Sequence, residues 1–177
     1  TTIRTAFELA RTGRPGPVVI DIPKDFQNWE GKFIGSGLLP LTGYQTRLRS
    51  VVENQLTDDA CERFYKILDA SERPLIYAGG GIINGNATKS MRHFANTYGI
   101  PITTTLMALG ASDTKHPLSL HMLGMHGMAF ANYAVEDCDL LIAMGARFDD
   151  RVAGDPTNFA PNAKNIAHFD VDVSDLD

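Results

Sequence analysis

The amino-acid sequence predicts an α/β fold in which a parallel sheet is flanked by helices on both faces. Uninterrupted apolar runs that end at a turn residue, such as 140–144, are typical of parallel strands buried on both sides. After residue 50, such runs alternate with segments of helical periodicity. Each run leads into a polar or glycine-containing turn, at 79, 105, 145 and 170. Because parallel strands share one carboxyl edge, these turns predict a ligand site there, of a kind that suits a nucleotide.

The first part of the chain predicts few elements. Apolar residues at helical spacing predict an amphipathic helix over 2–12, ended by Gly13. The short apolar run 17–22 lies between prolines and predicts a strand. From 29 to 52 the pattern is irregular, and so long a stretch without periodicity predicts an interdomain linker.

Residues 53–177 carry the alternating pattern. A helix begins at a cap, Thr57 or Asp58, and ends near Ala70. The other expected elements, in chain order, are strand 75–78, a helix ended by Gly99, the extended run 101–105, a long loop containing 121–127, a helix over 128–135, strands 140–144 and 166–170, and a helix that begins after 170.

Composition limits the possible roles. The 177 residues are 44% hydrophobic, enough for one core or one core and part of another. A net charge of -5 gives no basic field for nucleic acid, and no apolar run approaches the roughly 20 residues of a membrane span. Cys61 and Cys138 predict no disulfide framework and a reducing compartment. Because the sequence lacks an initial Met and stops where a helix would begin, we expect a fragment of a longer protein.

The turns offer several candidate ligand contacts. Residues 79–81, all glycine, let backbone amides approach a phosphate or simply make a tight strand-to-helix turn. Asp170 ends a strand, where a carboxylate can accept from ribose hydroxyls or cap the next helix. His121 and His126 have no carboxylate or thiol beside them, so we expect no metal site. Met125 and His126 suit contact with a planar cofactor better.

Four charges follow the strand at 140–144. These charged residues fit either a solvent-exposed turn stabilised by local ion pairs or a ligand site. Arginine presents a planar fork to carboxylates and phosphates, so Arg147 and Arg151 could each hold an anionic group, with Asp149 and Asp150 orienting the forks. The chain offers no nucleophile paired with a general base, which indicates that it forms part of a site.

Five motifs carry a resemblance to a known family. They are GRPGPVVIDIPKD from 13, GGG from 79, TLMALG from 105, HMLGMHG from 121 and GARFDDRVAG from 145. In this order the chain resembles the catalytic subunits of acetolactate synthase (acetohydroxyacid synthase), thiamine diphosphate-dependent enzymes. The resemblance implies that 1–28 end the pyrimidine domain, that 29–52 are a linker, and that 53–177 are the Rossmann-like central domain, which binds FAD.

The resemblance also implies an activity. The family condenses two pyruvates, or pyruvate and 2-oxobutanoate, with loss of CO2, in branched-chain amino acid biosynthesis. Thiamine diphosphate and Mg2+ are bound mainly by domains that have no counterpart here, so the chain alone is expected to be inactive, with no catalytic residue and no metal ligand. Arg151 corresponds to the family's arginine for the carboxylate of the second oxoacid. The residues implied to bind FAD are Arg14, Gly80, Thr105, Leu106, Met107, Leu123, Gly124, Met125, His126, Gly145, Arg147, Asp149, Asp150, Asp170 and Val171.

Further expectations concern partners and rival readings. The resemblance implies a homo-oligomer with a small regulatory subunit, no nucleic-acid or membrane partner, and a bacterial cytoplasmic location, or a plastid or mitochondrion in a eukaryote. Ala108 and Ala153 depart from the family's usual glycine and threonine. Alternatives are a glyoxylate carboligase or pyruvate oxidase type of thiamine enzyme, and a stand-alone nucleotide-binding module without catalysis. A generic dehydrogenase is less favoured because GxGxxG is missing.

Overall fold

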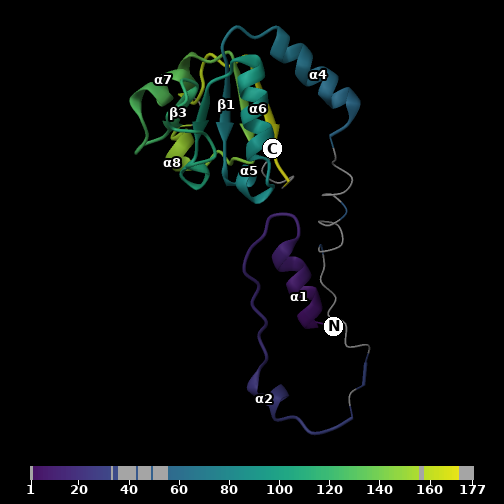
Figure 1. Cartoon of the computed structure of the whole chain (residues 1–177). Coiled ribbons are helices and arrows are strands. Elements are labelled where there is room, and N and C mark those ends of the chain that lie inside the picture. The colour runs from purple at the N-terminus through teal and green to yellow at the C-terminus, as the bar shows by residue number, and fades with distance from the viewer. Residues whose placement is uncertain are drawn as a thin grey trace. The chain divides into compact units, whose positions relative to one another are not determined.

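The computed structural model divides the chain into two compact units, Thr1–Gln55 and Leu56–Asp177. It describes residues 2–32, 34, 35, 43, 49, 56–155 and 158–171. Figure 1 shows the elements of both units.

The first unit holds two helices within the described residues, α1 (Thr2–Arg11) and α2 (Lys24–Gln27). The predicted first helix is confirmed, and Gly13 follows it with φ +66°. The strand predicted at 17–22 is wrong: these residues are exposed and belong to no sheet. An apolar run becomes a strand only where a neighbouring strand takes its backbone hydrogen bonds, and none of the described residues does so here. The predicted linker falls largely outside the described residues.

The second unit is built on a parallel sheet, as predicted. Its strands are β1 (Pro74–Ala78), β2 (Ile102–Thr104), β3 (Ser119–Met122), β4 (Leu140–Met144) and β5 (Asn165–Phe169), in the order β3-β2-β1-β4-β5. All four pairings are parallel. The sequence predicted a loop where β3 lies. An edge strand is paired on one side only, and the half-buried SLHM has no apolar run to reveal it.

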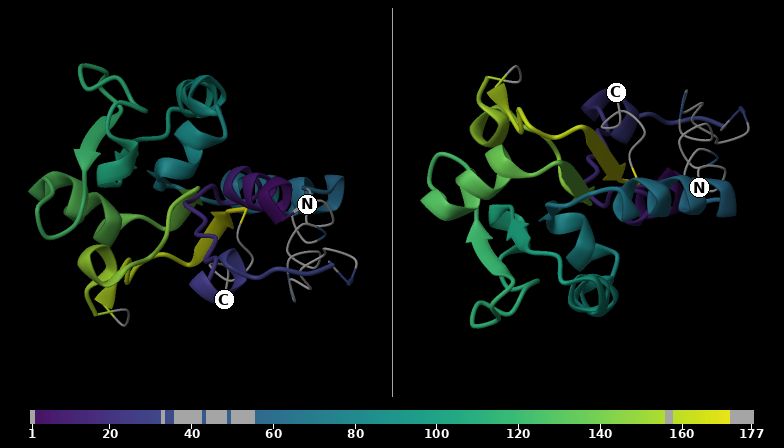
Figure 2. Two further views of the ribbon diagram at one scale, coloured as in Figure 1. Left: turned by 90° about the horizontal axis from the view of Figure 1, so that it is seen from below. Right: turned by 90° about the horizontal axis from the view of Figure 1, so that it is seen from above.

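Helices cover both faces of this sheet. They are α4 (Asp58–Asp69), α5 (Gly80–Asn84), α6 (Thr88–Tyr98), α7 (Ala129–Asp137), α8 (Asp150–Ala153) and the 3-10 turn η1 (Leu106–Ala108). The teal α6 and the green α7 lie on opposite sides of the sheet (Figure 2). Side chains alternate between two core clusters: Ile76 and Ile142 pack with α6, whereas Tyr77 and Leu141 pack with α7.

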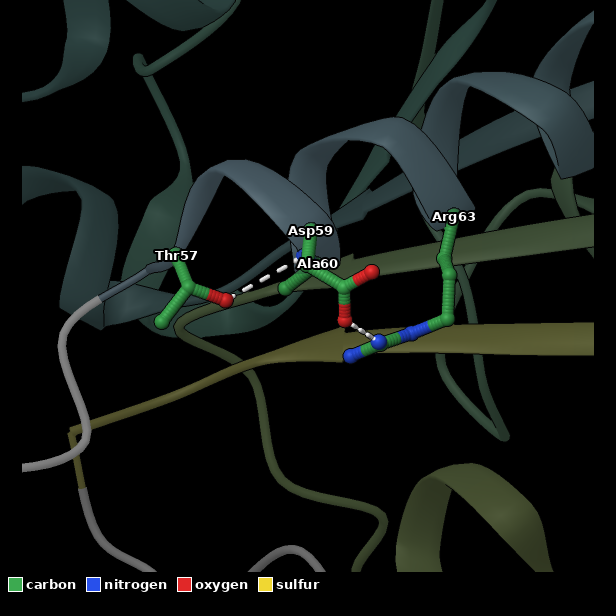
Figure 3. A network of polar contacts seen from close by, with 4 residues as sticks. All are labelled: Thr57, Asp59, Ala60 and Arg63. Atoms are coloured by element: carbon green, nitrogen blue, oxygen red, sulfur yellow. Dashed lines mark hydrogen bonds and ion pairs between the residues drawn. The ribbon is translucent and has the colours of Figure 1, made fainter.

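The helix ends follow the capping residues of the sequence. Thr57 caps α4 as predicted, because its Oγ1 accepts a hydrogen bond from the Ala60 amide at 3.2 Å. In the same first turn, Asp59 pairs with Arg63, which lies one turn further along the exposed face (Figure 3). Gly99, at φ +68°, ends α6 in the left-handed conformation that glycine adopts freely.

Two remaining predictions concern covalent links and the chain's last residues. Cys61 and Cys138 are both free thiols, as expected, and Cys138 is buried. The predicted helix after 170 lies almost wholly outside the described residues. Among the helices that are described, none has the length and apolar character of a bilayer span.

Candidate functional site

The carboxyl edge of the sheet brings the predicted turns together. Figure 1 shows α5 where β1 ends. Gly81 N donates to Gly145 O at 3.0 Å, Gly145 N donates to Phe169 O at 2.8 Å, and Leu123 N lies 3.4 Å from Thr104 O. The turns after β1, β4 and β5 are therefore joined by backbone hydrogen bonds, and the loop after β3 is joined to the end of β2. A single edge carrying all the candidate turns is what the parallel pattern predicted.

The glycines at this edge allow two turns to pack backbone to backbone. A Cβ on Gly79 would lie 2.0 Å from Gly145 O, and one on Gly81 would lie 2.6 Å from Gly145 Cα. Gly145 itself has φ +57°. Of the two readings of the triplet, the tight turn accounts for Gly79 and Gly81. Gly80 differs, because its neighbour is Met107, whose Cβ lies 3.1 Å from the position of an added methyl group.

The loop after β3 is fastened to α7 and to α8. Asn132 Nδ2 donates to Gly124 O at 3.2 Å, and its Oδ1 accepts from Gly124 N at 2.8 Å. Met125 N donates to Arg151 O. The Leu123 side chain is buried in the core, so only its backbone can face a ligand, whereas the side chains of Met125 and His126 are exposed.

Both arginines after β4 present exposed guanidinium groups. The carboxylates beside them do not orient these groups as expected: within the described residues, neither Arg147 nor Arg151 forms an ion pair. Asp149 instead caps α8, accepting from Arg151 N at 3.1 Å. The backbone N–H groups at a helix N-terminus are fixed donors for a carboxylate, whereas a solvent-exposed ion pair contributes little stability. The Asp149 carboxylate is therefore more stable as a helix cap than in an ion pair. The guanidinium groups remain available to an anionic ligand.

Two side chains from neighbouring strands hold this turn, and an aromatic ring of the turn itself packs against both. Tyr77 OH donates to Arg147 O at 3.1 Å, and His168 Nε2 lies 2.8 Å from Ala146 O. The Phe148 ring packs against both, with centroid distances of 5.7 Å to Tyr77 and 5.2 Å to His168. Burial, and then the charge of Asp149, raises the pKa of the Tyr77 hydroxyl above its usual value, so it stays a donor. Tyr77 and His168 were not among the predicted site residues, although both are polar side chains within apolar strands.

Two threonine hydroxyls at the end of β2 lack partners. Thr104 Oγ1 and Thr105 Oγ1 are buried, and neither has a hydrogen-bond partner within the described part of the chain. Thr104 is only 3% exposed. A buried hydroxyl without a partner costs about 1–3 kcal/mol, so two such hydroxyls among the described residues mark the end of β2 as a candidate site. Thr105 was predicted as a site residue, whereas Thr104 was missed.

Exposed apolar side chains follow these hydroxyls directly in the sequence, and another lies on the loop after β3. Leu106, Met107 and Met125 are 67%, 74% and 77% exposed. Large apolar side chains left open beside unpartnered polar groups are typical of a binding surface for a planar organic molecule. The combination of apolar contacts, unpartnered hydroxyls and a free guanidinium fits a dinucleotide cofactor.

The remaining candidates lie as follows. The Asp170 carboxylate is mostly buried, 3.9 Å from His168 Nε2, and Val171 is 41% exposed. Asp150 is exposed in the first turn of α8. Arg14 belongs to the first unit and follows α1. No group of three or more His, Cys, Asp or Glu residues that could hold a metal ion occurs among the described residues.

Comparisons with known proteins bear on this site. The family described as "Thiamine pyrophosphate enzyme, central domain" matches residues 61–177. The chain is 46% identical over 178 residues to "Probable acetolactate synthase large subunit" of Methanocaldococcus jannaschii, covering 99% of this chain and 29% of the relative. It is 46% identical over 171 residues to "Acetolactate synthase large subunit" of Corynebacterium glutamicum, covering 97% and 26%. It is 43% identical over 180 residues to "Acetolactate synthase, chloroplastic" of Arabidopsis thaliana, covering 98% and 25%.

The likeness to acetolactate synthases stated from the motifs is thus confirmed, and the chain spans less than a third of the length of these relatives. The Rossmann-like α/β sheet is also what this family implies. The chain belongs to the thiamine pyrophosphate enzyme family, whose central domain its second unit contains.

Proposed function

We propose that this chain is the FAD-binding part of an acetolactate synthase large subunit. Similarity over nearly the whole chain to proteins of that name supports the enzyme. The observation that supports the ligand is the carboxyl edge. Among the described residues, two threonine hydroxyls there have no hydrogen-bond partner, the exposed Arg147 forms no ion pair, and methionine side chains are exposed. In this proposal 1–28 end the pyrimidine domain, 29–52 form the linker and 53–177 form the central domain.

The parts of the cofactor match the chemistry of this edge. The Arg147 guanidinium would hold a phosphate, and Met107 and Met125 would cover planar ring surface. Thr105 would donate to a polar atom of the cofactor, and Asp170 would accept from ribose hydroxyls. Leu123 and Gly124 would contact the cofactor through their backbone atoms alone, because the Leu123 side chain is buried and Gly124 has none. Arg14 would reach the cofactor from the pyrimidine domain.

In the whole enzyme the proposed reaction joins two pyruvates, or pyruvate and 2-oxobutanoate, with loss of CO2. Thiamine diphosphate with Mg2+, bound mainly outside this chain, would supply the carbon chemistry. Arg151, exposed and without an ion pair among the described residues, would bind the carboxylate of the second oxoacid. FAD would have a structural role, since the net reaction is not a redox reaction.

The same proposal extends to assembly and location. The words "large subunit" in the relatives' names support a small regulatory partner, and we propose a homo-oligomer of the large subunit. Bacterial and chloroplastic relatives support a bacterial cytoplasmic or a plastid location.

Titration of the purified chain with FAD tests the cofactor. We expect saturable quenching of flavin fluorescence and a rise in melting temperature with FAD, and neither with NAD. If this chain shows no binding while the full-length protein that contains it binds FAD, the neighbouring domains complete the site. Should both fail to bind, the cofactor assignment is wrong.

Arg147→Ala should weaken FAD binding. Loss of one charge-assisted contact costs about 1.5–3 kcal/mol, or about 10- to 150-fold in Kd. Arg63→Ala is the matched control, because Arg63 is an exposed arginine on α4 that pairs with Asp59. Equal affinities of the two variants would contradict the phosphate-binding role of Arg147.

Arg151→Ala should impair the whole enzyme at the second oxoacid. In the full-length protein we expect its KM for pyruvate in acetolactate formation to rise by about tenfold or more, since a bidentate carboxylate contact is lost. FAD affinity should change less than in Arg147→Ala. Unchanged carboligation and substrate choice would remove Arg151 from the substrate site.

A further inference from the structure

We infer that His168 is a positioning residue that holds the turn carrying Arg147 in place beside the carboxylate of Asp170. The inference deepens the proposed function and rests on it, because both groups belong to the proposed FAD site. His168 itself has no role in the motifs that suggested that site. Its place in β5, beside the strand that carries the turn, gives it one.

The hydrogen bond of His168 has a defined direction. Its Nε2 lies 2.8 Å from the backbone oxygen of Ala146. Because a carbonyl oxygen only accepts, Nε2 must carry the hydrogen, which selects one tautomer of the neutral ring. The side chain of His168 is 12% exposed, so water competes little for this bond.

The same ring stands beside the second group of the site. His168 Nε2 lies 3.9 Å from Asp170 Oδ2, and the Asp170 side chain is 10% exposed. At this distance the contact is not a hydrogen bond, and the Nε2 hydrogen is engaged by Ala146 O, so the ring fastens the turn while lying beside the carboxylate. One side chain of β5 therefore contacts the turn after β4 and approaches the carboxylate at its own strand end.

The turn is held from both neighbours of β4. Tyr77 of β1 bonds Arg147 O, His168 of β5 bonds Ala146 O, and the Phe148 ring packs against both side chains. Consecutive carbonyls are thus fixed by side chains from opposite sides. Such a turn presents the Arg147 guanidinium without first having to be ordered, and preorganisation of this kind raises affinity by reducing the entropy lost on binding.

Two substitutions at His168 separate its hydrogen bond from its bulk. His168→Phe keeps a ring against Phe148 and loses the donor. His168→Gln loses the ring, but its amide nitrogen reaches about as far as Nε2 and can donate to Ala146 O. His93→Phe, at an exposed position on α6, is the matched control. Melting temperatures of all variants are measured first.

The first readout needs no ligand. We expect amide hydrogen exchange at 147–151 to be about tenfold faster in His168→Phe than in the unchanged chain, the factor for one hydrogen bond, and to return within about threefold in His168→Gln. Exchange in β1 should not change. Equal exchange at 147–151 in His168→Phe and the unchanged chain would overturn the inference.

The second readout is FAD affinity by fluorescence titration of the full-length protein. We expect the Kd for FAD to rise about tenfold in His168→Phe and to return toward the value of the unchanged protein in His168→Gln. The Kd of His93→Phe should not change. If the unchanged protein binds FAD but His168→Phe binds it equally, the inference fails and the proposed function stands. If the unchanged protein does not bind FAD, the proposed function fails, and with it the assignment of His168 to an FAD site.

A third readout covers a variant that does not fold. Nitrogen-15 NMR of the unchanged chain reports which ring nitrogen of His168 carries the hydrogen. We expect the hydrogen on Nε2, in slow exchange with water. A neutral ring with its hydrogen on Nδ1 would overturn the inference without any substitution.

Discussion

The two edges of the parallel sheet differ in the hydrogen bonding of a buried polar side chain. At the amino edge, Asp139 precedes β4 and is 7% exposed, and it accepts from Ser71 Oγ and from the amides of Glu72 and Arg73, both at 2.9 Å. At the carboxyl edge, Thr104 is 3% exposed and its hydroxyl has no partner among the described residues.

This difference separates stability from binding within one sheet. The hydrogen bond from Ser71, opposed by burial but aided by the two amides, lowers the pKa of Asp139 to about 2. That carboxylate fastens the loop before β1 to the start of β4. The carboxyl edge instead leaves hydrogen-bonding capacity unused and costs the fold stability, which is typical of a site prepared for a ligand.

Asp139→Ala should show the largest effect. It removes the buried carboxylate that accepts from Ser71, Glu72 and Arg73 in partly buried hydrogen bonds, which we expect to lower the free energy of unfolding by about 3 kcal/mol. Asp137→Ala removes an exposed carboxylate of the same charge nearby and should change it by less than about 0.5 kcal/mol. Urea unfolding measures both. Similar losses in the two variants would break the contrast between the edges.

The pH dependence of stability sharpens the same contrast. Because folding lowers the pKa of Asp139 from 3.8 to about 2, its contribution is complete above pH 4 and is lost as the pH falls through the folded value. The unchanged chain should lose stability between pH 4 and 2 more steeply than Asp139→Ala. Melting temperature measured against pH tests this. If it falls equally in the two proteins as the pH is lowered, Asp139 does not have this role.

Thr104→Val should have the smallest effect on stability, with the opposite sign. The replacement removes a hydroxyl that has no partner among the described residues. We therefore expect the free energy of unfolding to stay the same or to rise by up to about 1 kcal/mol. Thr103→Val is the matched control, because Thr103 Oγ1 donates to His121 O at 3.0 Å, and it should lose about 1 kcal/mol. A clear loss of stability in Thr104→Val would mean that the hydroxyl serves the fold.

Secondary structure was predictable where one segment carried the whole signal. The apolar run of β4 and the helical periodicity of α1 and α6 were sufficient, because burial of a continuous face decides these elements. The prediction of a strand at 17–22 and the prediction of a loop in place of β3 were wrong for the same reason. Whether a segment becomes a strand depends on a neighbour elsewhere in the chain, which local composition does not contain.

The candidate site was predictable in part. That the turns at 79, 105, 145 and 170 belong to one edge follows from parallel strands alone. That Asp149 caps a helix rather than orienting an arginine depends on where α8 begins. The contacts of Tyr77 and His168 with one turn depend on both strands flanking β4, and nothing in the chain order shows which strands are neighbours.

The sequence by itself determined the fold class, the ends of α4 and α6, and the family, because periodicity, capping residues and motifs are properties of single segments. The tertiary structure decided which polar groups are satisfied and which remain open. It joined Asp139 to donors nearly seventy positions earlier in the chain and left Thr104 without any among the described residues. Hydrogen bonding depends on distances in space between groups that are far apart in sequence, and only the sheet order sets these distances.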